Sequence, residues 1–373
     1  MGEESMVDVD QTPRARTKRG RGHPLIASPG TSLPVRTESQ SGQSELSSRS
    51  SPSKQMSAME LSSGGFECRI ISLTDPKLPP ALSGLLEELE ECNIGLGVVS
   101  RNLQAKIHDM ARLDRSFHLF KEHIFASPTD RDRLGPTPSL DDVASLLEEA
   151  KACRLMFQSE PSWNTMVHYP LLKLAVYGPR RRDQLVGMVP CTNAKIIREY
   201  LPPCSQFKKI DLCVYVVPDM DGVADNAIKS TREDLPCQTI NHTDYYPLRN
   251  WPIAVSIETK NQAGDKLAAA ELQLGTWHTA QWKLLEDLVA KSGGSFVDLP
   301  FLPAVVVKGD EWSFVATTRD GSKTVLWFNT VFGSTKTPLG VYSAVWGLQR
   351  LTKWASDIYW PWFRKNALRI PEG

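Results

Sequence analysis

The amino-acid sequence predicts an α/β protein in which helices flank a mixed central β-sheet. Residues 207–217 and 252–260 carry Ile, Val and Leu at alternating positions, which is typical of buried strands. Residues 264–292 follow with helical periodicity and end at a Gly-Gly pair, as a long helix does. Residues 37–65, by contrast, consist mainly of Ser, Gln, Glu and Gly, and they cannot bury enough apolar surface to fold alone.

Composition excludes several classes of protein. The chain has 43 basic and 43 acidic residues among 373, so its net charge of zero argues against nucleic-acid binding through high global charge, while a local patch stays compatible. No run approaches 18 consecutive apolar residues, so we expect no membrane-spanning helix. The first 30 residues lack an apolar signal core, and the seven cysteines form no Cys-x-x-Cys pair. An intracellular, reducing location is therefore expected, without disulfide framework or structural zinc.

We expect residues 1–65 to form a disordered tail. Residues 14–21 place five basic side chains in eight positions. This run is compatible with a nuclear-import signal or with an arm that touches nucleic acid, and equally with a solvated basic tail. A nuclear location is the alternative that the first of these interpretations implies.

Residues 66–137 are predicted to form a helical extension. The leucines Leu82, Leu85, Leu86 and Leu89 recur at helical spacing, with glutamates on the opposite face. These helices carry no recognisable chemistry, so we expect a cap or a partner surface.

Residues 138–373 are predicted to form the main domain. Ser139 is placed to cap one helix, and residues 161–176 predict a second helix that Pro170 kinks or splits. After the strand at 207–217, residues 219–250 are predicted to form a loop, because they are rich in Asp, Asn, Thr and Pro. The remaining expected elements are strands at 305–307, 312–318 and 324–328, and an aromatic-rich closing helix at about 340–367.

The candidate site lies on the two buried strands. Period-two alternation puts Glu258 and Lys260 side by side on one face, about 7 Å apart along the strand. Asp211 lies on the preceding strand, where an ionised carboxylate is unfavourable unless it is paired or bound to a cation. If the strands pair, two carboxylates and one ammonium group converge.

This constellation suits a hard divalent cation. Carboxylate oxygens at one end of a sheet can hold Mg²⁺, which activates water and stabilises charge on a phosphate. The neighbouring lysine can orient the water or act as a point charge. The alternative is that a Glu-x-Lys pair on a strand is simply a solvated surface pair, as most such pairs are.

Four other features have structural interpretations. Asp219 follows a strand and reads as a turn residue, so Asp211 is preferred as the ligand. His168 is expected to be packed or hydrogen-bonded rather than a catalytic base. Gln273 is placed equally well as a core-edge amide and as a site residue. The C-terminal tryptophans are expected in the core, although base stacking is the functional alternative; they are Trp346, Trp354, Trp360 and Trp362.

The ordered set of these motifs resembles a known family. Asp211 is followed by Ile257-Glu258-Thr259-Lys260 and by a helix containing Glu271 to Trp277. Further matching segments are Trp163 to His168, Asn241 to Thr243, Pro300 to Pro303 and Trp360 to Phe363. Together they resemble the PD-(D/E)XK nuclease-like domain found in many fungal proteins, over roughly residues 140–367.

The resemblance implies a fold and a set of roles. The fold is a restriction-endonuclease-like core of order α-β-β-β-α-β. Asp211 and Glu258 are implied ligands of Mg²⁺, with Mn²⁺ as a substitute, and Lys260 is the implied catalytic lysine. Gln273 corresponds to the polar residue on the helix after the core strands. Glu160 corresponds to an extra acidic residue on the first core helix.

Three functions follow as hypotheses. The first is a metal-dependent nuclease that hydrolyses phosphodiesters in DNA, or less favourably RNA, through metal-activated water. The second is a catalytically inactive member of the fold that serves as a nucleic-acid-binding or protein-interaction module, which the neutral net charge favours. The third is an interaction protein whose helices at 78–157 bind a partner while the nuclease-like part is a scaffold.

Overall fold

The computed structural model describes residues 51–179, 184–203, 205, 208–261 and 267–371. All elements below belong to one compact unit, residues 49–373. The basic run at 14–21 and most of the expected disordered tail lie outside the described residues.

The centre of the fold is a large, mostly antiparallel sheet, which among the described residues has seven strands. Their spatial order is β1-β9-β8-β7-β6-β5-β4. The β1/β9 and β6/β7 pairs are parallel, and the other neighbours are antiparallel. The strands are β1 (Phe66–Ile70), β4 (Val186–Pro190), β5 (Leu212–Val216), β6 (Ile253–Lys260), β7 (Leu302–Lys308), β8 (Glu311–Asp320) and β9 (Lys323–Ser334). A separate parallel pair joins β2 (Val99–Ser100) to β3 (Phe125–Ala126).

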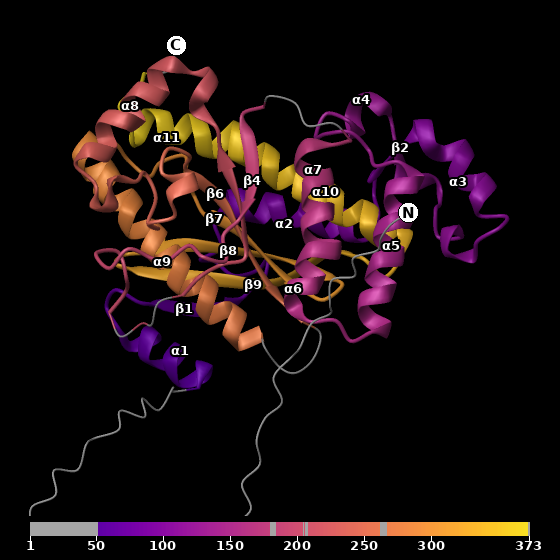
Figure 1. Ribbon diagram of the computed structural model, residues 1–373, viewed down its shortest axis with the longest axis horizontal. Helices are drawn as coiled ribbons and strands as arrows, with labels where there is room; N and C mark the ends of the chain where they lie inside the picture. The colour runs from indigo at the N-terminus through magenta and orange to yellow at the C-terminus, as the bar shows by residue number, and fades with distance from the viewer. Residues whose placement is uncertain (1–50, 180–183, 204, 206–207, 262–266, 372–373) are drawn as a thin grey trace, which may run out of the picture. The chain divides into compact units, whose positions relative to one another are not determined.

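Helices flank this sheet on both faces (Figure 1). The long helix α9 packs against β6, β7, β9 and β1, while α10 and α2 pack against β9 and α7 against β4. The α-helices are α1 (Pro52–Leu61), α2 (Pro80–Asn93), α3 (Gln104–Met110), α4 (Pro128–Arg131), α5 (Leu140–Leu155), α6 (Glu160–Trp163), α7 (Tyr169–Tyr177), α8 (Gly222–Glu233), α9 (Leu267–Ser292), α10 (Pro338–Trp354) and α11 (Trp360–Asn366). No helix among the described residues is long and apolar enough to cross a membrane.

Most elements predicted from periodicity are present. The strands expected at 305–307, 312–318 and 324–328 fall within β7, β8 and β9, the strand expected at 252–260 corresponds to β6, and the long helix corresponds to α9. Ser139 caps α5 through a reciprocal capping box with Asp142. The four C-terminal tryptophans pack into the hydrophobic core, as predicted.

Four elements differ from the expectation. The segment predicted as a loop contains the helix α8, whose first turn is capped by Asp221. Residues 52–61, expected in the tail, form α1, and β4 was not foreseen. In the expected helical extension, β1 is a strand of the main sheet and pairs with β9. Its partner strand lies more than 250 positions away in sequence, so no local sequence pattern could predict the pairing.

The predicted disturbance at Pro170 takes a specific form. A π-helical segment, Asn164–His168, joins α6 to α7 and ends two residues before that proline. The same arrangement recurs near the C-terminus, where the π-helical segment Ala355–Tyr359 ends two residues before Pro361. Proline has no N–H to donate to the preceding turn, and a π-bulge lets the helix continue with that hydrogen bond missing.

Candidate active site

The sheet topology brings Asp211 beside Glu258. Strand β5 begins at Leu212, which pairs with Ile257 of antiparallel β6. The backbone N–H of Asp211 donates to the carbonyl oxygen of Ile257 over 3.2 Å, and Cys191 donates to the carbonyl of Asp211 over 2.7 Å. Asp211 is thus held between two chain segments where β5 starts and β6 ends.

Glu258 is the most buried acidic group of the site. Its side chain is fully excluded from solvent, and Oε1 forms an ion pair with Nζ of Lys260. Its second oxygen, Oε2, is buried with no hydrogen-bond partner. A buried carboxylate oxygen without a donor is unfavourable, and a cation placed there would offset the cost.

The carboxylate of Asp211 is oriented by β6. Its Oδ2 accepts hydrogen bonds from the backbone N–H and the hydroxyl of Thr259, both at 2.8 Å. The sequence predicted a buried aspartate, whereas Asp211 is half-buried and it is Glu258 that is inaccessible. Of the two carboxylates, Asp211 is therefore the one that solvent reaches.

Lys260 is fixed by three contacts. Its Nζ donates to Glu258 and to the carbonyl oxygen of Thr259, the latter over 2.9 Å. Its own carbonyl accepts from the N–H of Gly309, at the turn between β7 and β8, over 2.8 Å. The ammonium group consequently occupies one position inside the site instead of sampling solvent.

The electrostatics of the cluster favour added positive charge. Burial, and then the negative charge of Asp211, raise the pKa of Glu258 well above its ordinary value, against the opposing effect of Lys260. Burial alone would lower the pKa of Lys260, but Glu258, Glu160 and Asp211 together raise it. Burial dominates the shift of Glu258 and the neighbouring carboxylates raise the pKa of Lys260, so a bound divalent cation would stabilise the ionised form of Glu258.

Glu160 and Gln273 also lie at this end of the sheet. Glu160, the first residue of α6, is close enough to act electrostatically on both Glu258 and Lys260. Gln273 of α9 is half-buried, and its Nε2 donates to the carbonyl oxygen of Lys209 over 3.1 Å. This contact ties the long helix to the segment that leads into Asp211.

Lys208 is a neighbour of the site that the sequence reasoning missed. Burial lowers the pKa of its ammonium group, and the negative charge of Glu258 opposes that effect. Its Nζ donates to Oε1 of Gln55 in α1 over 3.3 Å. The sequence does show two consecutive lysines just before Asp211. It could not predict that Lys208 lies near Glu258, because that proximity depends on tertiary contacts.

His168 supports the turn that holds Lys260. It is fully buried, and its Nε2 lies 2.8 Å from the carbonyl oxygen of Gly309. Because a carbonyl only accepts, Nε2 carries a proton, and Nδ1 lies 2.8 Å from Oδ1 of Asn164. In a neutral ring Nδ1 accepts from the NH₂ group of this amide, which requires the flipped orientation of Asn164. Burial lowers the pKa of His168 to about 4, so the ring is neutral at pH 7. The prediction of a packed, hydrogen-bonded histidine agrees with these contacts.

Asp219 lies at the other end of β5 from Asp211. It falls in the 3₁₀ turn Pro218–Met220, and its Oδ1 accepts from Nε1 of Trp251 over 3.0 Å. This role in a turn agrees with the sequence interpretation.

The donor set fits a small hard cation, although it is sparse. Among the described residues, no group of three or more His, Cys, Asp or Glu side chains is arranged as a complete metal site. Asp211 and Glu258 supply carboxylate oxygens, and one of them, Glu258 Oε2, is unpartnered. Mg²⁺ is commonly bound by one or two carboxylates and completes its shell with water and substrate phosphate.

Comparison with known proteins gives the family. The sequence matches the PD-(D/E)XK nuclease superfamily over residues 108–360, which is more than half of the chain. No curated protein and no solved structure matches the chain. With this match and the Asp211, Glu258 and Lys260 cluster at one end of the sheet, the chain belongs to the PD-(D/E)XK nuclease superfamily.

Proposed function

We propose that the protein is a metal-dependent nuclease that hydrolyses phosphodiester bonds, with DNA as the preferred substrate over RNA. The observation that carries this proposal is the buried, unpartnered Oε2 of Glu258, which lies in a cluster with Asp211 and Lys260. A buried carboxylate oxygen without a donor is costly, and a bound cation would offset that cost.

Asp211 and Glu258 are the proposed ligands of Mg²⁺, with Mn²⁺ as a substitute. When bound, the cation supplies a Lewis acid for the phosphate and lowers the pKa of water. Thr259 keeps the Asp211 carboxylate in place through two hydrogen bonds. Burial of Glu258 excludes bulk water, which strengthens every charge interaction around it.

Lys260 is the proposed catalytic lysine. Its ammonium group remains protonated, because the surrounding carboxylates raise its pKa. A fixed positive charge at this point stabilises the negative charge that develops on a phosphate during attack. We assign Glu160 and Gln273 supporting roles, the first as an added negative charge near Lys260 and the second as an anchor for the segment before Asp211.

We further propose a restriction-endonuclease-like core of order α-β-β-β-α-β within this fold. Its members are α7, the strands β4 to β6, α9 and β7, in chain order. The helix α8 is then an insertion between the second and third strands.

The proposal is tested on the full chain with supercoiled plasmid, single-stranded DNA and single-stranded RNA. Cleavage is expected with Mg²⁺ or Mn²⁺ and not with EDTA. Asp211→Asn and Lys260→Met should each lower the rate by about 10²-fold or more, on the scale seen when one charge-stabilising group is removed. Asp219→Asn is the matched control, an aspartate at the other end of the same strand, and should keep the wild-type rate.

Two outcomes would overturn the assignment. One is cleavage that is equally fast in the Asp211 and Lys260 variants. The other is nucleic-acid binding without cleavage in any divalent metal and without metal binding by calorimetry. The second result would favour the inactive binding module of the same fold.

A further inference from the structure

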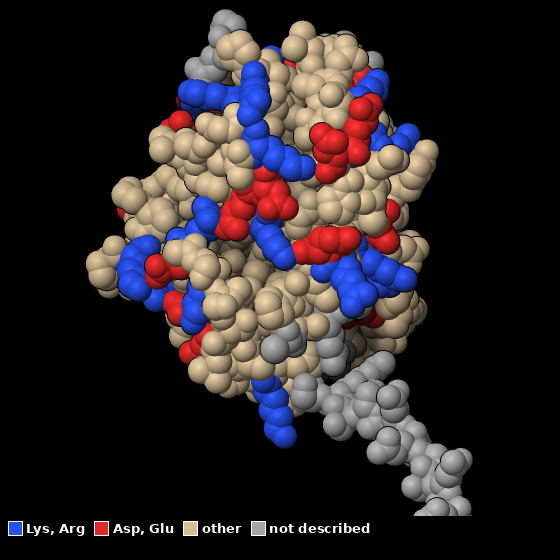
Figure 2. All heavy atoms as spheres, turned by 90° about the vertical axis from the view of Figure 1, so that its left-hand side faces the viewer, with Lys and Arg blue, Asp and Glu red and all other residues tan. Residues whose placement is uncertain are grey.

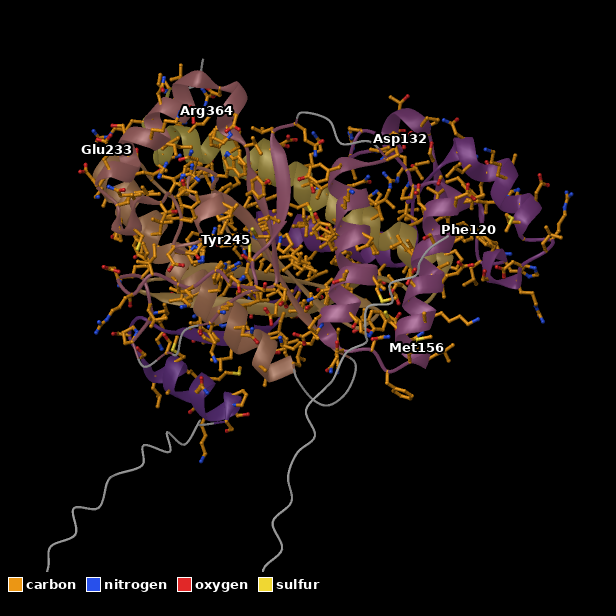
Figure 3. All side chains as sticks on the ribbon, viewed as in Figure 1. Phe120, Asp132, Met156, Glu233, Tyr245 and Arg364 are labelled. Carbon is orange, nitrogen blue, oxygen red and sulfur yellow. The ribbon has the colours of Figure 1, made fainter. Side chains whose placement is uncertain are left out.

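The end of α5 carries three consecutive apolar side chains that face solvent. Leu155, Met156 and Phe157 are 70%, 69% and 94% exposed. Figure 3 shows Met156 at this end of the helix, and Figure 1 shows α6 beside it. Single exposed apolar residues are ordinary, but a contiguous group at a loop tip indicates a contact surface.

The backbone of this tip forms a left-handed C-cap of α5. Phe157 has φ of 49°, in the left-handed region that bulky residues rarely adopt. The N–H of Met156 bonds to the carbonyl of Ala152, and that of Gln158 to the carbonyl of Cys153, both at 3.0 Å. Cys153 is buried in a small cluster with Trp163. This C-cap and the buried cluster beside it hold the tip in place, and its three apolar side chains project into solvent.

The same tip is tied to the turn that holds Lys260. Arg154 of α5 forms an ion pair with Asp310, whose side chain is fully buried. The hydroxyl of Thr335 also donates to Asp310, over 2.9 Å. Gly309, the neighbour of Asp310, donates to the carbonyl of Lys260. The position of the tip is thus coupled to the position of the proposed catalytic lysine.

The distance from the tip to the site is short. Glu160 follows Phe157 by three residues, which span at most about 11 Å even when fully extended. Glu160 acts electrostatically on Glu258 and Lys260, so it lies at the rim of the site. A nucleic-acid strand that passes Glu160 as it leaves the site comes within reach of this part of the chain.

We propose that Phe157, flanked by Met156, stacks on an unpaired base of the nucleic-acid substrate next to the scissile phosphate. The inference rests on the proposed nuclease function and adds a preference for single-stranded or frayed substrate over a closed duplex. Aromatic rings stack on any base, because every base presents a π-face, so the contact needs no sequence match. In a closed duplex the bases already stack on one another, and the ring has no face to meet.

The experiment measures binding separately from cleavage. The Lys260→Met chain is titrated with a fluorescent 12-nucleotide single strand and with a blunt hairpin duplex, in EDTA and in Ca²⁺. Adding Phe157→Ala should weaken single-strand binding about tenfold, within the range for loss of one stacked base, and leave duplex binding unchanged. Phe157→Trp should restore single-strand binding. Leu113→Ala, at another apolar side chain that is 86% exposed, is the matched control and should have no effect.

Phe157→Gly serves as the control for folding. Glycine adopts a positive φ without strain, so this variant should melt at the wild-type temperature or higher while it binds the single strand as weakly as Phe157→Ala. Equal dissociation constants for all Phe157 variants would overturn the inference. So would a wild-type dimer that Phe157→Ala converts to monomer, since a second copy of the chain would then cover the tip. Weakened binding in a protein that cleaves nothing would support the stacking contact and refute the nuclease assignment alone.

Discussion

Glu258 and Lys260 form an ion pair along one face of β6 that engages only one of the two carboxylate oxygens. In a closed structural pair, the second oxygen would also accept a hydrogen bond. Here it is buried without a donor, and the neighbouring Asp211 adds negative charge. A bound cation, as proposed, would satisfy this second oxygen and offset the added negative charge.

The first prediction concerns stabilisation by metal. At a concentration about 100-fold above its dissociation constant, a ligand stabilises the folded state by about 2.7 kcal/mol. For a chain of this size, Mg²⁺ or Mn²⁺ should therefore raise the melting temperature by roughly 5 °C. Glu258→Gln and Asp211→Asn should abolish this rise, and Asp219→Asn should retain it. An undiminished rise in Glu258→Gln, measured by scanning calorimetry, would place the cation elsewhere.

The second prediction separates positioning from metal binding. Gln273→Ala removes the hydrogen bond to the carbonyl of Lys209 and loosens the segment before Asp211. We expect cleavage to slow about tenfold, because small displacements in a site are costly, while the metal-induced rise in melting temperature persists. Lys283→Ala is the control, since Lys283 lies on the same helix and also donates to a backbone carbonyl, that of Glu199. Equal rates in the two variants would remove Gln273 from the site.

The third prediction concerns pH. The pKa of His168 is lowered to about 4 by burial, from an ordinary value of 6.5. Between these values the unfolded chain binds a proton that the folded chain does not, so the free energy of unfolding falls as the pH drops. The shift corresponds to about 3 kcal/mol for this fully buried group. His168→Gln should therefore lose about that much less stability than wild type between pH 7 and pH 4 in urea titrations. Parallel pH profiles would mean that His168 does not titrate as its burial indicates.

The fourth prediction tests whether β1 packs under α9. A Cβ on Gly275 would lie 2.4 Å from the ring of Phe66 in β1. Gly275→Ala should thus destabilise the protein by about 2 kcal/mol through overpacking, and Phe66→Leu should recover part of this in a double-mutant cycle. Gly84→Ala in α2 is the control, because a Cβ there meets no atom within 4 Å. It should stabilise the helix by about 0.5–1 kcal/mol. Additive effects of the two substitutions would contradict the contact.

The charge pattern of the surface bears on how a substrate is held. On the face shown in Figure 2, Lys and Arg side chains are interspersed with Asp and Glu. This mixture accords with the net charge of zero. This surface does not favour long-range electrostatic attraction of a nucleic acid. It fits better a substrate that is recognised by local contacts, such as the one proposed for Phe157.

Several elements could be predicted because their signals are local. The period-two pattern of β6 identified Glu258 and Lys260 as neighbours, and their ion pair confirms that they share a face. The helix α8 escaped prediction because its sequence is polar and only Ala224 and Ile228 are buried. The strands β1 and β4 lie at the two edges of the sheet and are only five residues long. Over so few positions, an alternation of apolar and polar residues does not distinguish a strand.

The sequence alone determined which functional groups the candidate site contains. They are two carboxylates and an ammonium group on apolar strands, and a long helix follows them. It could do so because side-chain direction along a strand is a local property of the backbone. Only the tertiary structure decided that Glu258 is the inaccessible acid and that Lys208 and Glu160 lie close enough to act on its charge. Burial and electrostatic proximity depend on segments that are distant in sequence, and the folded packing alone brings these segments together.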